Sequence, residues 1–146
     1  MLSAFDVSDF FLTVQDVDFT GEGITNLKLQ KLLYYAQGFH LASYDELLFS
    51  ETIEAWQHGP VVSEVYEKYK IYGASMIPVP EVLDLTKFLT ETKDFLNHIY
   101  VTFGKYSAWQ LRNATHEEMP WKRGWARVNA FITHEDLKEF FKNFYA

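Results

Sequence analysis

The stretch from Thr25 to Tyr44 constrains the fold most, because its apolar residues recur at intervals of three and four. The residues in this pattern are Leu29, Leu32, Leu33, Ala36, Phe39 and Ala42. Such intervals place apolar side chains along one face of an α-helix. Thr25 precedes the pattern and can cap its first turn with its hydroxyl group. The stretch therefore predicts a long amphipathic helix against which other elements pack.

The segment after this helix combines a strand pattern, a turn and a second helix. Residues 51–56 alternate polar and apolar side chains, which is the period of a β-strand. Gly59 and Pro60 then predict a sharp turn and exclude a continuous element through it. A second apolar stripe over 62–72 predicts another helix, which Gly73 ends. Residues 76–80 are expected to be extended and to pair with 52–56, as an edge strand because of their prolines.

The rest of the chain carries further helix patterns with capping residues. An apolar stripe over 1–17 has Ser3 as a possible cap and is followed by a glycine-containing loop over 18–24. Further starts are expected at Thr90, Ser107, Thr115 and Thr133, the last three with a capping partner three residues on. The sequence thus predicts a mainly α, single-domain helical bundle over residues 1–146. A small β-hairpin or two-stranded element lies around residues 52–56 and 76–80.

Aromatic residues are abundant, with 13 Phe, 9 Tyr and 4 Trp in 146 residues. A domain of this size cannot hide all of them, and exposed rings favour contacts with a partner protein. Tyr34 and Tyr35 are neighbours, so their side chains leave a helix about 100° apart. We therefore expect one of the two to reach the surface or a groove, while the other packs in the core.

The composition narrows the possible partners and the cellular compartment. The formal net charge of −7 disfavours binding to nucleic acid, although Lys122, Arg123 and Arg127 form one small basic cluster. The sequence has no cysteine, which excludes disulfides and thiolate metal sites and suits a reducing compartment. No apolar run is long enough to cross a membrane, and the N-terminus lacks the features of a signal peptide. A cytoplasmic protein is the expectation.

The usual signatures of catalysis are missing from the sequence. The five histidines are scattered singly, without the paired spacing of a helical zinc site. No nucleophile elbow and no glycine-rich phosphate loop is present. These absences favour a protein that is not an enzyme and needs neither metal nor cofactor. A metal-dependent hydrolase built on His58 and His116 remains the alternative.

Three separated motifs resemble one known family. They are LKLQKLLYYAQG over 27–38, IEAW together with HGPVV over 53–62, and SAW followed by THEEMPWK over 107–122. In order and separation they resemble the SocA-like family, also called the Panacea domain. The resemblance implies an antitoxin, phage- or prophage-associated, that neutralises a cognate toxin by direct protein–protein binding. The family also implies an alternative, a proteolytic adaptor that delivers the toxin to an ATP-dependent protease.

The partner-binding residues are expected in and around these motifs. The turn after residue 56 and the motif over 115–121 each combine a tryptophan, a histidine and a rigid proline, and they form one groove if they adjoin in space. Each has a structural alternative, in which the tryptophan packs on the core and the histidine ties down a loop. The predicted partner-binding residues are Tyr35, Trp56, His58, Pro60, Tyr66, His116, Glu117 and Trp121.

Overall fold

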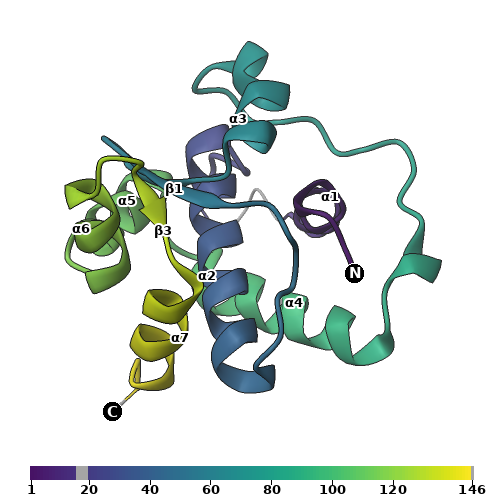
Figure 1. The fold of residues 1–146 in the computed structure, drawn as a ribbon. Coiled ribbons are helices and arrows are strands. Elements are labelled where there is room, and N and C mark those ends of the chain that lie inside the picture. The colour runs from purple at the N-terminus through teal and green to yellow at the C-terminus, as the bar shows by residue number, and fades with distance from the viewer. Residues whose placement is uncertain (16–19, 146) are drawn as a thin grey trace.

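The fold is organised around the central helix α2, Asn26–Tyr44. A computed structural model describes residues 1–15 and 20–145 of the chain, and Figure 1 shows α2 in the middle of the other elements. The Thr25 hydroxyl accepts a hydrogen bond from the backbone N–H of Lys28 (3.3 Å), which caps the helix as predicted. The helix ends at Asp45, whose backbone is left-handed (φ 56°). The predicted central helix is therefore confirmed.

Six further α-helices pack around α2 in the described part of the chain. They are α1 (Ala4–Val14), α3 (Ser63–Tyr69), α4 (Thr90–Phe103), α5 (Ala108–His116), α6 (Met119–Ala126) and α7 (His134–Lys142). Two short 3₁₀ turns, η1 (Lys70–Tyr72) and η2 (Leu85–Lys87), lie on the long connection between α3 and α4. Figure 1 shows this connection as a wide arc beside α1. The expectation of a mainly helical bundle is confirmed.

Several predicted helix starts are confirmed, and two are wrong in detail. The hydroxyl groups of Ser3, Ser107 and Thr133 each accept a hydrogen bond from the backbone N–H of the residue three positions later, as predicted. Thr115 instead lies in the last turn of α5, where its hydroxyl donates to the carbonyl of Arg112 (2.8 Å). Thr90 is the first residue of α4 rather than its cap. The first helix ends at Val14, and its expected continuation and following loop fall partly on residues 16–19, outside the described residues.

The β element differs from its prediction in the choice of partners. Strand β1 (Ile53–Trp56) lies between β2 (Gly59–Val61) and β3 (Phe131–Ile132), and both pairings are antiparallel. A strand therefore does run through Gly59 and Pro60. Proline is tolerated there because β2 is an edge strand, where its missing N–H leaves no ladder bond unmade.

Residues 76–80 form no strand, so their predicted pairing with 52–56 is wrong. The backbone of Ile77 satisfies its polar groups elsewhere. Its N–H donates to the carbonyl of Ile24 (2.9 Å), and its carbonyl accepts from the side-chain amide of Gln15 (3.2 Å). These contacts fasten the segment to the loop before α2 instead of to the sheet.

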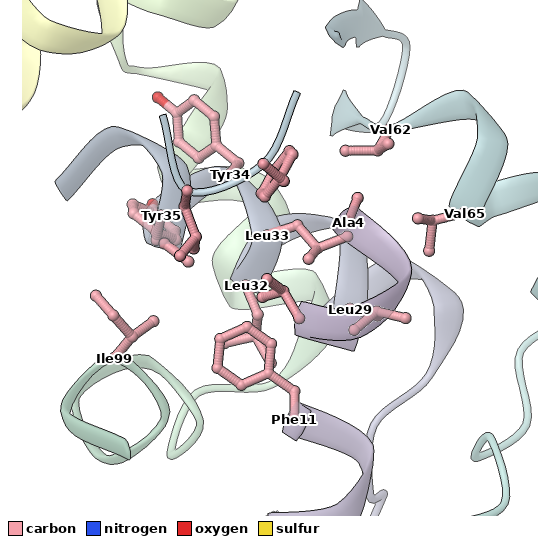
Figure 2. Packing of buried hydrophobic residues seen from close by; sticks show 14 of the residues in the cluster. Ala4, Phe11, Leu29, Leu32, Leu33, Tyr34, Tyr35, Val62, Val65 and Ile99 are labelled. Carbon is pink, nitrogen blue, oxygen red and sulfur yellow. The ribbon is translucent and has the colours of Figure 1, made fainter. Parts of the chain in front are cut away.

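The core surrounds α2 on most of its circumference. Figure 2 shows leucines of α2 packed among Phe11 of α1, Ile99 of α4, and Val62 and Val65 near the start of α3. Both Tyr34 and Tyr35 are buried, with 0% and 1% of their surface exposed, so the expectation that one of them reaches the surface is wrong. Helices pack on more than one side of α2, and a helix covered in this way has room for two buried neighbours.

Helix α7 packs directly on α2 at Gly38. A methyl group at this position would overlap the ring of Phe141. We expect Gly38→Ala to lower the free energy of unfolding by about 2 kcal/mol, because overpacking outweighs the gain in helix propensity. Chemical denaturation of the variant and the wild type measures this difference. A stability equal to or above wild type would contradict the close contact of α2 and α7.

Candidate functional site: a tryptophan face beside a buried polar network

The two sequence motifs adjoin in space at the turn between β1 and β2. His116 at the end of α5 places its Nε2 atom 2.8 Å from the backbone carbonyl oxygen of Gln57. The indole Nε1 of Trp121, on α6, donates to the carbonyl oxygen of Trp56 (2.8 Å). These two contacts fasten the turn to both helices, so that the side chain of His58 projects from a fixed backbone.

The side chain of His116 links α5 to the turn between β1 and β2. Its other ring nitrogen, Nδ1, lies 2.7 Å from the backbone carbonyl oxygen of Arg112, one turn earlier on α5. A ring that carries both protons donates to the two carbonyls at once, whereas the neutral ring donates to one of them. The ring also lies 4.0 Å from that of Trp121, measured between centroids. The contacts of His116 are those of the structural alternative, in which the histidine ties down the loop.

Exposed aromatic rings lie around His116. Trp109 on α5 and Trp125 on α6 are 54% and 53% exposed. The ring of Trp109 lies 5.8 Å from that of His58 and 4.5 Å from the guanidinium carbon of Arg112. Trp125 stacks on Trp121 with centroids 5.4 Å apart. We call the set His58, Trp109, Arg112, Trp121 and Trp125 the tryptophan face.

The other predicted site residues fall in three settings. Tyr35 and Pro60 are buried, so neither side chain is accessible to a partner in the folded protein. Tyr66 and Trp56 are half-buried, with their rings edge to face at 5.0 Å. Glu117 is exposed, 3.8 Å from the ammonium of Lys122. Trp109, Arg112 and Trp125 are the face residues that the sequence prediction missed.

A buried carboxyl group lies beneath this surface at Glu118. Its two oxygens accept hydrogen bonds from the hydroxyl groups of Tyr34 and Tyr35, each at 2.9 Å. Burial raises the pKa of Glu118 to about 7, although both tyrosine hydrogen bonds act to lower it. Burial, followed by the charge of Glu118, raises the pKa of both tyrosines. The group joins α2 to the start of α6.

Lys31, a buried lysine of α2, contacts the β1–β2 hairpin. Lys31 has no exposed surface, and its ammonium donates to the carbonyl oxygen of Pro60 (3.2 Å). Burial, followed by the positive charge of Arg112, lowers the pKa of Lys31 to about 7. The sequence signal for Lys31 was a charged residue inside the apolar helix pattern of α2. Nothing in the sequence shows that this residue contacts Pro60 of β2.

A pocket of about 430 Å³ opens between α2, the β1–β2 hairpin and α3. Its wall includes Asn26, Lys31, Trp56, His58, Tyr66 and Lys70. His58 therefore belongs to both the pocket and the tryptophan face, whereas His116 does not line the pocket. His116 instead contacts the backbone carbonyl of Gln57, the residue before His58.

Residues 1–15 and 20–145 contain no group of three or more metal-binding side chains in a suitable arrangement. Within the same ranges, no helix has the length and apolar character needed to cross a membrane.

Fold and site together define a small, mainly helical domain that displays tryptophan rings above a buried polar network. The chain belongs to the Antitoxin SocA-like, Panacea domain family, whose sequence model matches residues 29–122. Antitoxin SocA of Caulobacter vibrioides (strain NA1000 / CB15N) is 33% identical over 109 residues, which cover 67% of this chain. The chain spans 58% of the length of that relative. No solved structure matches significantly.

Proposed function

We propose that this protein is a cytoplasmic antitoxin that neutralises a cognate toxin by binding it directly through the tryptophan face. The observation that carries the proposal is the exposure of Trp109 and Trp125 on adjoining helices, on either side of a rigidly held turn. Tryptophan and arginine are the residues most enriched at the energetic centres of protein interfaces. Membership in a family of antitoxins supports a protein partner.

The arrangement favours binding without rearrangement of the face. His116 and Trp121 hold the turn through two backbone hydrogen bonds, and Arg112 packs over the ring of Trp109. Groups held in place before binding lose little conformational entropy when a partner arrives. The bound toxin would be neutralised by occlusion of its own active surface.

The charge near the face refines the expected partner. The net charge of −7 alone favours a basic toxin. Around the face, however, Arg112 has no ion-pair partner among the described residues, whereas Lys122 and Arg123 are paired with Glu117 and Asp136. A toxin that places an acidic group opposite Arg112 and basic groups at the periphery fits both features.

We expect truncation of the two exposed tryptophans to abolish neutralisation while leaving the fold intact. Trp109→Ala and Trp125→Ala should each weaken toxin binding by about 30-fold or more, the loss typical of a hot-spot residue. The measurement is calorimetric titration of the purified toxin encoded beside the gene, together with growth of cells that express both proteins. Leu89→Ala is the matched control, because Leu89 is an exposed apolar residue (74%) on the far connection.

Unchanged affinity in both tryptophan variants would exclude this face as the toxin-binding surface. The adaptor alternative has its own readout, the half-life of the toxin in cells that contain an ATP-dependent protease. Direct inhibition predicts that growth rescue persists when the protease is deleted. Rescue that disappears with the protease, together with a toxin half-life that shortens when the antitoxin is present, would replace direct inhibition with delivery.

A further inference from the structure

The pocket beside the tryptophan face has the walls of a ligand site. Trp56 and Tyr66 place two aromatic rings edge to face, and Leu27 and Val61 add aliphatic surface. Its volume of about 430 Å³ lies within the range of small-molecule sites, which are mostly apolar with a few polar groups. The walls therefore suit a ligand with a flat apolar body.

The polar groups of the wall differ in how far they are already satisfied. Asn26 donates to the carbonyl oxygen of Tyr66 and accepts from the amide of Gln30. Lys70 forms an ion pair with Glu67 (2.6 Å) at the exposed rim. These groups are held by their neighbours, and they leave little for a ligand to gain.

Lys31 differs from Asn26 and Lys70 in this respect. Its ammonium has three donors, and the carbonyl of Pro60 is the acceptor that the described residues place within hydrogen-bonding distance. No carboxylate of the described residues forms an ion pair with it, and the nearby Arg112 repels it. A buried cation of this kind is costly without an anion, and its field acts through protein instead of water.

We propose that this pocket binds a small organic carboxylate with a flat apolar body. The carboxylate would lie toward Lys31, and the body would pack against the rings of Trp56 and Tyr66. One uncompensated ammonium matches one negative charge, whereas a phosphate would need more donors than the wall provides. The proposal does not rest on toxin binding, and the free protein suffices to test it.

The test is a titration of the ¹⁵N-labelled full chain with three matched probes, followed by NMR. Indole-3-acetate has both the carboxylate and the flat body, indole-3-acetamide lacks the charge, and acetate lacks the body. We expect indole-3-acetate to bind at least tenfold more tightly than indole-3-acetamide, and acetate to bind more weakly than either. The shifted signals should be the indole N–H of Trp56 and the backbone amides of Asn26 and Tyr66.

Two variants locate the charge that the probe recognises. In Lys31→Met the tenfold preference for the carboxylate over the amide should disappear, while indole-3-acetamide binds as before. Lys138→Met removes a lysine of α7 that pairs with Asp45, and it should leave the preference unchanged. If Lys31→Met does not fold, Tyr66→Ala serves as the test instead. This variant removes one wall of the pocket and should lower the affinity for both indole probes at least tenfold.

Three results would overturn the proposal. The first is equal affinity of the wild-type protein for indole-3-acetate and indole-3-acetamide. The second is a set of shifted signals that lies outside the pocket. The third is a full preference for the carboxylate in the folded Lys31→Met variant.

Discussion

Replacing Glu118 with alanine is expected to lower the free energy of unfolding by about 3 to 5 kcal/mol at pH 6. The hydroxyl groups of Tyr34 and Tyr35 both donate to this carboxyl group, and both are buried. Its removal leaves two buried donors without an acceptor, at about 1–3 kcal/mol each, and adds a cavity. Urea denaturation of both proteins measures the difference. A loss below about 1 kcal/mol would mean that water replaces the carboxyl group.

Glu118→Gln should behave differently, because an amide can reproduce the protonated carboxyl group. Its oxygen accepts from one tyrosine hydroxyl, and its NH₂ group donates to the other hydroxyl oxygen. We expect this variant to retain most of the wild-type stability at pH 5. It should be more stable than the wild type at pH 8, since it carries no charge into the core.

The pH dependence of stability follows from the raised pKa of Glu118. The native state binds this proton more tightly than the unfolded chain, because the pKa rises from 4.5 to about 7 on folding. The contribution of Glu118 is therefore complete below pH 4.5 and is lost as the pH rises through 7, by about 3 kcal/mol in all. Lys31 acts in the opposite direction near pH 7, because its pKa falls from 10.5 to about 7 on folding and the unfolded chain then binds the proton more tightly than the native state.

The measurement is the difference in unfolding free energy between the wild type and Glu118→Gln from pH 4.5 to 8. Taking the difference removes groups that titrate alike in both proteins. We expect the difference to change in favour of Glu118→Gln as the pH rises. A difference that stays constant over this range would mean that Glu118 titrates at its ordinary pKa.

Gly59→Ala is expected to destabilise the protein by about 4 kcal/mol and to detach the turn from its supports. The backbone of Gly59 has φ +110°, a conformation that residues with a Cβ atom rarely adopt. An added Cβ would lie 2.5 Å from the Cε of Lys31 and 2.9 Å from the Oγ1 of Thr115. Strain and overpacking each cost about 1–3 kcal/mol. Thermal unfolding of the variant provides the measurement.

Gly73→Ala separates strain from crowding. Gly73 also has a positive φ, +57°, but a Cβ there has no neighbour within 4 Å. This control should lose about 1–3 kcal/mol, the cost of a backbone conformation (φ 57°, ψ −127°) that residues with a Cβ atom rarely adopt. If both variants lose the same amount, the close approach of Gly59 to Lys31 is not what limits the turn. NMR of Gly59→Ala should also show changed signals for Trp56 and His116, which depend on the turn.

Local patterns were sufficient to predict most helices of this fold. The intervals between leucines in α2 and the hydroxyl of Thr25 depend on near neighbours, and both expectations are confirmed. The partner of β1 was predicted wrongly because strand pairing depends on distant residues. Residues 131–132 supply the third strand, and no local signal distinguishes them from 76–80. Proline in β2 was misjudged for a related reason, since an edge position is a property of the assembled sheet.

The candidate site was predictable only in part, from residues that stood within the recognised motifs. His58 and Trp121 were identified within motifs that the structure brings together. Helix geometry predicted that either Tyr34 or Tyr35 reaches the surface, because it cannot show that a carboxyl group far along the chain accepts hydrogen bonds from both hydroxyl groups. Nothing in the sequence distinguished Trp109 and Trp125 from buried tryptophans. Their exposure depends on which helices pack beside them.

The contact between α2 and α7 has a consequence for the order of folding during synthesis. A nascent chain that has emerged as far as residue 122 contains the whole family-matched region, yet it lacks Phe141, which packs on Gly38 and Tyr34. That side of α2 must stay uncovered on the ribosome until residues 134–142 follow. Until then the aromatic side chains of α2 are available to chaperones, and the domain completes its core only after α7 has emerged.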